Sequence, residues 1–300
     1  MRVLMAGLGD IARKAYLPVL ATTPGIELHL ATRNRAALTE LGATYRIAHL
    51  HDGLDAALAA TSFDAAFVHS ATAAHPSMAE ALLHHGAAVF VDKPLADSFD
   101  EAARLVDLAD RQGRLLGIGF NRRFAPDYVA LRTQPRGFML MQKHRRAQPD
   151  TPRSVVFDDF IHVVDTLRFL APAPIQRTQI ETIVRDGLLS GVTVTLAGDG
   201  HHAIGTMQRE SGLDEERLDI IAGDRRRSVL NLSETGDQNG IDTRRRRGDW
   251  TPVTRQRGFE AMCADFLAGV REARPTAAED ILATHRLCED IVRHAERQPS

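Results

Sequence analysis

The feature that most constrains the fold is a regular alternation of short apolar runs with amphipathic stretches over the first 120 residues. The runs have the length of strands and cover residues 3–6, 26–32, 45–50, 64–69, 87–91 and 115–120. Alanine-rich stretches of helical periodicity separate them. Strands joined by helices of this length pair in parallel through right-handed crossovers. The pattern predicts an α/β fold with a doubly wound parallel sheet over residues 1–120.

After about residue 120 the rhythm changes. Strand-like segments follow one another with turns of glycine, aspartate and asparagine between them, at 137–144, 180–185, 192–196, 202–208, 217–222 and 228–232. Two helical segments, 257–272 and 278–296, close the chain. Successive strands joined by turns favour antiparallel pairing. We therefore expect a second domain at 121–300, of the α+β class, with a large open and mostly antiparallel sheet.

A glycine-rich turn ends the first strand. Its sequence, Gly7-Leu8-Gly9-Asp10-Ile11-Ala12, fits the pattern G-x-G-x-x-A. In such a pattern the first glycine permits the turn, the second lets the backbone approach a pyrophosphate, and the third small residue lets helix and strand pack. The phosphates then lie at the positive end of the following helix. The first domain is thus predicted to be a Rossmann-type dinucleotide-binding domain, with Gly7, Gly9, Asp10, Ile11 and Ala12 at the phosphates.

The end of the second strand bears on the choice of cofactor. An NAD site normally has an acid there, which holds the ribose hydroxyls. Here the strand runs into Thr32, Arg33 and, two residues later, Arg35, without an acid. A neutral hydroxyl followed by arginines suits a 2′-phosphate. We therefore favour NADP over NAD and expect these three residues to contact it; the alternative is that both arginines are exposed residues at the start of a helix.

Lys93 stands between an aspartate and a proline, directly after the fifth apolar run. The proline restricts Lys93 to an extended backbone and permits a cis peptide bond. A lysine at the carboxyl end of a parallel strand lies at the crevice where open α/β sheets bind ligands. Burial there would lower its pKa and let it exchange protons near neutral pH. Ser70, Thr72 and His75 follow the fourth run and, together with Lys93, are expected to line the same crevice as cofactor contacts.

A very apolar helical segment at 155–170 carries one polar stripe, formed by Asp158, His162 and Asp165. Buried ionisable groups are costly unless they are paired. The stripe is therefore either the solvent face of the helix or a site with His162 as general acid or base and Asp158 as its partner. Asp165, further along, is expected to accept a hydrogen bond from another element.

Further candidate substrate contacts come from the start of the second domain and from one of its strands. Asn121 and Arg122 follow the last strand of the first domain, and Lys143 ends a strand of the second. With Asp158 and His162 they form the predicted substrate-binding set.

Composition excludes several classes of protein. The 300 residues carry a formal net charge of −2, which argues against nucleic acid as the main partner because phosphate neutralisation needs a basic excess. Two cysteines, Cys263 and Cys288, argue against a structural disulfide or a metal cluster and fit a reducing compartment. No apolar run is long enough to cross a bilayer, and because a strand is expected from residue 3 we expect no signal peptide before it. We expect a cytoplasmic protein without a metal ion.

Taken in order, five segments resemble the Gfo/Idh/MocA oxidoreductases. They are GLGDIA at the start, VHSATAAH after the fourth strand, VFVDKPLA for the family's EKP segment, GFNRRFAP at the crossover, and DDFIHVVD for its D-x-x-x-H helix. Nearly the whole length is similar. DKPL, GFNRRFAP, KHR and DDFIHVVDT together look closest to the bacterial virulence-factor MviM-type subgroup.

The resemblance implies a Rossmann domain followed by a domain whose open sheet often mediates homodimers or homotetramers. It implies catalytic roles for Lys93, Asp158 and His162. Two departures stand out: Asp92 replaces the usual glutamate, and the glycine-rich lead into the D-x-x-x-H helix is absent. That lead shapes the substrate pocket, so the family's substrates do not transfer to this chain.

These observations lead to one functional hypothesis with rivals. We expect an NADP-dependent oxidoreductase, with NAD possible, that moves hydride between the nicotinamide and a hydroxyl or carbonyl carbon of a sugar, polyol or related small molecule. Lys93 and His162 would handle the hydroxyl proton, helped by Asp158. The rivals are a non-catalytic NADP-binding sensor and a reductase of imines or tetrapyrroles.

Overall fold

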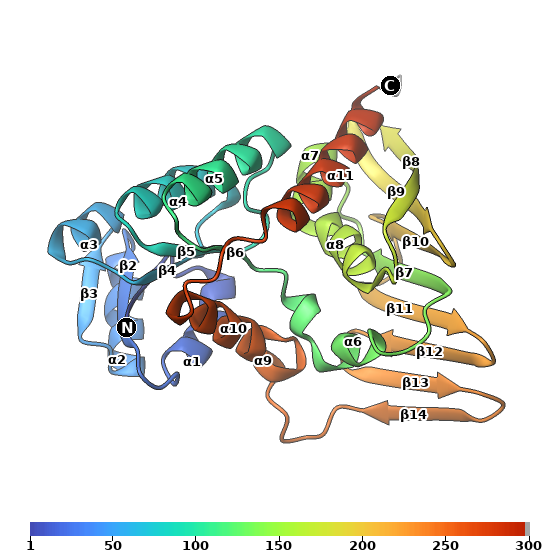
Figure 1. The fold of residues 1–300 in the computed structure, drawn as a ribbon, viewed down its shortest axis with the longest axis horizontal. Helices are drawn as coiled ribbons and strands as arrows, with labels where there is room; N and C mark the ends of the chain where they lie inside the picture. Colours follow the sequence, from blue (N-terminus) through green and yellow to red (C-terminus); the bar gives the residue numbers. More distant parts are fainter. Residues whose placement is uncertain (298–300) are drawn as a thin grey trace. The chain divides into compact units, whose positions relative to one another are not determined.

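The computed structural model describes residues 1–297 and divides into two compact units (Figure 1). The first consists of Met1–Phe120 with Phe259–Leu282, and the second of Asn121–Gly258 with the residues from Ala283 on. Each unit is built around its own sheet, which confirms the predicted fold class. The two are described separately below.

Within the described residues, the first unit contains a six-stranded sheet of order β3-β2-β1-β4-β5-β6. All pairings are parallel. The strands are β1 (Arg2–Ala6), β2 (Glu27–Thr32), β3 (His49–Asp52), β4 (Ala65–Val68), β5 (Ala88–Val91) and β6 (Leu116–Ile118). The direction of winding reverses between β1 and β4, and the carboxyl ends of strands at such a reversal are where open α/β sheets bind ligands.

Helices connect these strands. They are the π-helical segment η1 (Ala12–Tyr16), α1 (Leu17–Leu20), α2 (Arg35–Tyr45), α3 (Leu54–Ala60), the short η2 (Thr72–Ala74), α4 (His75–His84) and α5 (Phe99–Arg111). The side chains of Asn34 and Ser98 cap α2 and α5, because each accepts from a backbone N–H that has no partner within the helix. Pro18 follows η1, and α1 ends at Leu20.

A segment from the far end of the chain, residues 259–282, belongs with this unit. The helix α10 (Phe259–Arg271) places Phe266 against Phe67 and Phe90, with ring centroids 5.3 Å and 5.2 Å away. Gly117 of β6 makes room, since an added Cβ would lie 2.9 Å from the Phe266 ring. We had expected the residues around α10 in the second domain, whereas they complete the apolar core of the first unit.

The second unit contains an eight-stranded sheet of order β14-β13-β12-β11-β7-β10-β9-β8 in the described residues. Neighbouring strands are antiparallel except β7 and β10, which are parallel. The strands are β7 (Phe138–His144), β8 (Ile175–Arg185), β9 (Leu188–Gly198), β10 (His201–Gln208), β11 (Glu215–Ala222), β12 (Arg225–Leu230), β13 (Glu234–Gln238) and β14 (Asp242–Arg246). The prediction of a large, mostly antiparallel sheet is confirmed.

The helical segments of this unit gather on one side of its sheet (Figure 1). They are η3 (Asn121–Phe124), α6 (Pro126–Leu131), α7 (Pro152–Val155), the π-helical η4 (Val156–Phe160), α8 (Ile161–Leu170), α9 (Val253–Gln256) and the second half of α11 (Ala278–Glu296). Gly205 of β10 lets α8 approach, because an added Cβ would lie 2.6 Å from Val163 and 2.9 Å from Leu167.

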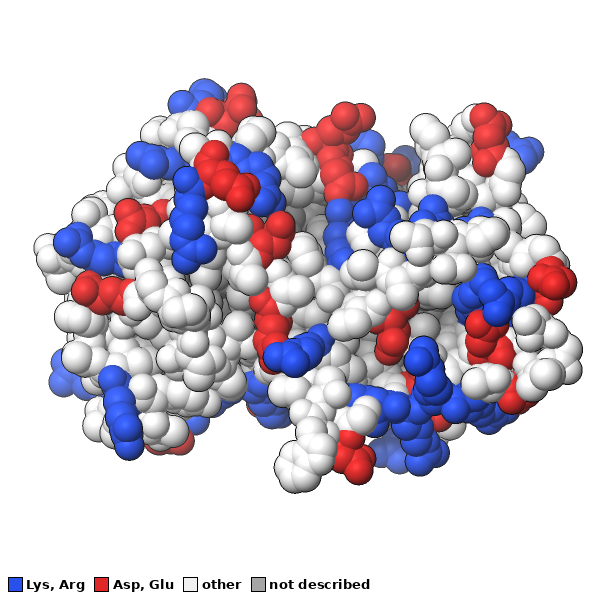
Figure 2. Space-filling model, turned by 60° about the horizontal axis from the view of Figure 1, so that its bottom comes forward, with Lys and Arg blue, Asp and Glu red and all other residues white. Residues whose placement is uncertain are grey.

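Charges of both signs are mixed on the face shown in Figure 2. The arginines of β12 and β14 have acidic neighbours: Arg225 lies 3.5 Å from Asp237, and Arg246 lies 3.1 Å from Glu234. Such pairs are mostly solvated and contribute little to stability. Among the described residues, no helix has both the length and the apolar composition needed to cross a membrane.

Candidate functional site

The first unit has a cavity of about 1040 Å³ at the carboxyl ends of β1, β2, β3 and β4. Its volume is at the upper end of the range typical of cofactor sites, about 300–1,000 Å³. The residues that line it are Gly7, Leu8, Gly9, Asp10, Ile11, Ala31, Thr32, Arg33, Asp52, Gly53, Leu54, Asp55, His69, Ser70, Ala71, Ala74, Ser77 and Met78. The structure thus brings most of the predicted cofactor residues around one space.

The two glycines of the first turn have different environments. Gly7 has φ +91°, and a Cβ there would lie 2.7 Å from the carbonyl of His69, so that the turn requires glycine. A Cβ on Gly9 would approach the described residues no closer than 4.0 Å, which leaves its backbone open to a ligand. Asp10 is exposed and pairs with Lys14 at 2.7 Å, while Ala12 is fully buried. This arrangement fits a pyrophosphate over Gly9.

Thr32 and Arg33 line the cavity, as predicted, but Arg35 does not. Arg35 donates two hydrogen bonds to Asp52 at the end of β3, at 2.8 Å and 2.5 Å. Arg33 makes no ion pair with any residue that the structure describes, and its side chain passes 3.6 Å from the position of a Cβ on Gly53. Arg33 is therefore the arginine available to an anionic group in the cavity.

The loop after β4 contributes Ser70 to the cavity wall, whereas Thr72 and His75 do not line it. His75 is buried. Its Nδ1 lies 2.7 Å from the carbonyl oxygen of Pro94, and its Nε2 lies 3.1 Å from that of Ser70. His75, predicted as a cofactor contact, thus connects the loops after β4 and β5.

His69, which directly follows β4, lines the cavity but was not among the predicted site residues. Its ring packs against Tyr16 at a tilt of 34°, with centroids 3.9 Å apart, and neither ring nitrogen has a hydrogen-bond partner among the described residues. Burial, helped by the charge of His75, lowers the pKa of His69 to about 3. The imidazole is therefore neutral at physiological pH.

Lys93 follows β5, and its peptide bond to Pro94 is cis. The neighbouring Asp92 accepts a hydrogen bond of 2.7 Å from the Tyr16 hydroxyl. Burial raises the pKa of Asp92, against the opposing effects of Lys93 and the Tyr16 hydrogen bond. Gly119 is required beside it, because a Cβ there would lie 2.6 Å from the carboxylate. Asp92 thus holds the strand end from which Lys93 extends, which agrees with the structural role expected of it.

In the second unit, Asp158 lies in the π-helical segment η4 and His162 in the first turn of α8. π-Helical segments inside helices often mark functional sites. Asp158 is exposed and His162 is half-buried. Asp165, in contrast, is buried and accepts from Arg123 at 2.5 Å and from the Thr284 hydroxyl at 3.3 Å. Of the three residues in the predicted stripe, Asp158 and His162 therefore lie near the solvent, whereas Asp165 has a structural role.

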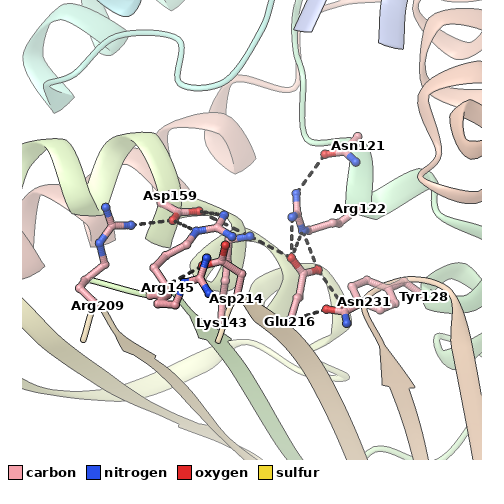
Figure 3. Close-up of polar contacts among 11 residues, drawn as sticks. Asn121, Arg122, Tyr128, Lys143, Arg145, Asp159, Arg209, Asp214, Glu216 and Asn231 are labelled. Atoms are coloured by element: carbon pink, nitrogen blue, oxygen red, sulfur yellow. Dashed lines mark hydrogen bonds and ion pairs between the residues drawn. The ribbon is translucent and has the colours of Figure 1, made fainter. Parts of the chain in front are cut away.

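The candidate substrate contacts Asn121, Arg122 and Lys143 are buried in a polar network around Glu216 (Figure 3). Arg122 donates to Glu216 at 2.6 Å and Lys143 at 3.1 Å, while Asn121 donates to the Arg257 carbonyl. Burial opposes the ionisation of Glu216, but Arg122 and Lys143 hold its pKa below the usual value. Their side chains are thus engaged inside the unit.

A second acid, Asp159, extends this network toward a cavity (Figure 3). It accepts from Arg145 at 2.6 Å and from Arg209 at 2.7 Å, and Lys143 lies 3.4 Å away. Burial opposes its ionisation, but Arg145, Lys143 and Arg209 lower its pKa. The cavity, about 330 Å³, is lined by Arg145, Gln148, Asp150, Ser154, Asp158, Asp159, Arg209 and Asp214.

Chemically, the two units offer different capabilities. The first presents an open backbone at Gly9 and an arginine, Arg33, in the wall of a cofactor-sized cavity, whereas Lys93, at the end of β5, is not among the residues that line it. The second presents Asp158 in the wall of a cavity rich in arginines and carboxylates, with His162 four residues further along the same helical stretch. An exposed carboxylate and a nearby imidazole can bind hydroxyl groups and exchange protons. The convergence of Lys93 with His162 stays a prediction.

Both units match known families. Residues 1–120 match the Gfo/Idh/MocA oxidoreductases, described as having an NAD-binding Rossmann fold. Residues 126–239 match the C-terminal domain of YceM-like proteins. Over 304 residues the chain is 33% identical to YceM of Salmonella typhimurium, with 98% of each chain covered; the name of that protein assigns it to the oxidoreductases and gives no substrate.

Solved structures of this family resemble the chain over nearly its whole length. A Gfo/Idh/MocA oxidoreductase from Vibrio cholerae superposes with a TM-score of 0.92 at 33% identity, covering 99% of both chains. The dehydrogenase MviM from Clostridium difficile gives 0.91 at 29% identity, covering 98% of this chain and 99% of the other. Over a shorter stretch, 56% of this chain and 53% of the other, the chain is 30% identical to the myo-inositol dehydrogenase Hyg17 of Streptomyces leeuwenhoekii.

The buried imidazole of His69 predicts a pH dependence of stability. Its pKa falls from 6.5 to about 3 on folding, so below pH 6.5 the unfolded chain binds a proton that the folded chain does not. Stability is therefore fully present above pH 6.5 and is lost as the pH falls toward 3, by about 1.4 kcal/mol per pH unit. We expect His69→Phe, which keeps a ring against Tyr16, to remove most of this slope.

Urea denaturation at pH 7, 6 and 5 measures the effect, with His85→Ala as a matched control at an exposed histidine. The control is expected to keep the slope of the natural protein. Equal slopes in His69→Phe and His85→Ala would contradict the assignment.

Proposed function

Because the chain belongs to the Gfo/Idh/MocA family of NAD(P)-binding oxidoreductases, we propose that it transfers hydride between NADP and a hydroxyl or carbonyl carbon of a sugar, polyol or related small molecule. The observation that carries the proposal is the cavity at the carboxyl ends of β1 to β4, with Gly7 and Gly9 in its wall. The similarity to a protein named as an inositol dehydrogenase supports a polyol-like substrate.

The bound dinucleotide supplies the hydride chemistry, and the residues of this chain bind and move protons. We assign Lys93 Nζ to donate a hydrogen bond to the reacting oxygen of the substrate. The imidazole of His162 takes the hydroxyl proton during oxidation and returns it during reduction. Asp158 orients His162 or accepts from a neighbouring substrate hydroxyl. Its exposure and its place in a cavity wall support this role.

Substitution of the proposed acid–base groups tests the mechanism. Lys93→Ala and His162→Ala are each expected to lower kcat about 10²- to 10⁴-fold, the usual effect of removing a positioned acid or base. Hydride transfer to or from the nicotinamide, followed by absorbance across a panel of sugars and polyols, measures turnover. His202→Ala is the control, because His202 is exposed on β10. Near-normal turnover in both folded variants would overturn the roles.

The cofactor preference is tested at Arg33. Arg33 lines the cavity and makes no ion pair with a described residue, whereas Arg35 is paired with Asp52. A charged hydrogen bond to a 2′-phosphate contributes about 1.5–3 kcal/mol. Arg33→Ala is therefore expected to weaken NADP binding about 10- to 100-fold and to leave NAD binding within about twofold.

Fluorescence or calorimetric titration of both cofactors gives these affinities. The exposed Arg111→Ala serves as the charge-matched control. If the natural protein binds NAD more tightly than NADP, or if Arg33→Ala weakens both cofactors equally, the preference for NADP is wrong.

We also propose that the protein acts as a homodimer or homotetramer through the sheet of the second unit. Support comes from the gathering of that unit's helices on one side (Figure 1), which leaves the opposite face of the described sheet without a helix of its own unit. Light scattering on purified protein should give two or four chains, and a monomer at micromolar concentration would contradict this. The buried free thiols of Cys263 and Cys288 support a reducing, cytoplasmic compartment, which cell fractionation tests.

A further inference from the structure

Four chelating side chains lie together on β2 and β3, the two strands at one edge of the first sheet. Glu27 and His29 alternate along β2, and His49 and His51 alternate along β3. The strands pair in parallel with His29 opposite His49. Because side chains two residues apart share one face of a strand, all four lie on the same face at the edge of the sheet.

The contacts within this group are short. His29 Nε2 lies 3.0 Å from Glu27 Oε1, and His29 Nδ1 lies 3.0 Å from His51 Nε2. The rings of His29 and His49 stack with centroids 4.2 Å apart. One ligand atom from each of Glu27, His29 and His49 can be chosen so that all three lie within 4.8 Å of one another.

We propose that Glu27, His29 and His49 bind a divalent transition-metal ion of the zinc type. Two imidazoles and a carboxylate form a ligand set that zinc takes with tetrahedral geometry, and water fills the remaining position. Zinc–ligand bonds of about 2.0–2.1 Å place neighbouring ligand atoms roughly 3.3 Å apart. The Glu27–His29 spacing of 3.0 Å is close to this value. Glu27 and His49 are exposed, so their side chains can rotate to complete the site.

The buried member of the set is already oriented. His29 is 4% exposed, and the edge of its ring packs against Phe63, with centroids 5.1 Å apart. Histidine ligands of metals usually hydrogen-bond through their other nitrogen, which fixes the ring and the tautomer. His51 occupies that position at His29 Nδ1.

The proton arrangement follows from these partners. A carboxylate only accepts, so without metal His29 donates from Nε2 to Glu27, and Nδ1 accepts from His51 Nε2. When the metal occupies Nε2, the proton of His29 lies on Nδ1 and is donated to His51, whose own proton moves to its Nδ1. In this exchange each of the two imidazoles keeps one ring proton.

The surrounding charges allow the site to form at neutral pH. The hydrogen bond from His29 lowers the pKa of Glu27, although desolvation opposes it. Burial, with His29 and His49 nearby, lowers the pKa of His51. The competing cation is Arg2, whose Nε lies 3.7 Å from Glu27 Oε1. It is half exposed and also bonds the Thr61 hydroxyl, where it can remain when Glu27 turns to a metal ion.

This site is separate from the cavity at the strand ends, because Thr32 and Asp52, rather than these four residues, line that cavity.

The experiment uses the full chain, stripped with a chelator and titrated with Co²⁺ by visible absorption and with Zn²⁺ by calorimetry. We expect one ion per chain with the strong absorption of tetrahedral cobalt. Glu27→Gln and His49→Ala should weaken binding at least about tenfold, and His51→Ala about 10- to 100-fold.

The control is His85→Ala, an exposed histidine of the same unit, which should bind like the natural protein. His49 and Glu27 are exposed, so their variants are expected to fold, and circular dichroism without metal checks this. Two results would overturn the proposal: no saturable binding by the natural protein, or the same affinity in His49→Ala as in His85→Ala.

Discussion

The buried carboxylate of Glu216 is the interaction on which the second unit depends. It receives hydrogen bonds from Arg122 of η3, Tyr128 of α6 and Lys143 of β7, so that one anion joins three segments to β11. Removing one partner of such a buried pair typically costs about 3–5 kcal/mol, because the other charge is left uncompensated. Lys143 also reaches Asp159. The same network therefore fixes the helical segment that presents Asp158.

Much of the architecture could be read from the chain because it rests on local patterns. Strand and helix signals alternate before residue 120, and strand signals follow one another after it. Both patterns are periodicities of the sequence, and they predict the two sheets that the structure contains. The packing of α10 on the first sheet could not be read in this way. It depends on Phe266 meeting Phe67 and Phe90 about two hundred residues away, and an apolar helix shows no preference for one sheet in its sequence.

The candidate site also has a part that the sequence predicts and a part that it does not. The glycine motif and the strand ends predict Gly7, Gly9 and Thr32 as cofactor contacts, and the structure places all three around one cavity. The sequence around Lys143 and Arg122 does not indicate that both pair with Glu216. The register between β7 and β11 places Lys143 opposite Glu216. The alternations E-x-H of β2 and H-x-H of β3 are visible in the sequence, but only the pairing of the two strands places His29 opposite His49.

The position of His75 has a mechanical consequence. The imidazole of His75 lies within hydrogen-bonding distance of two backbone carbonyl oxygens, that of Ser70 after β4 and that of Pro94 just beyond Lys93. A single buried side chain therefore ties the separation of the loop after β4, which lines the cavity through Ser70, to that of the loop after β5, which carries Lys93.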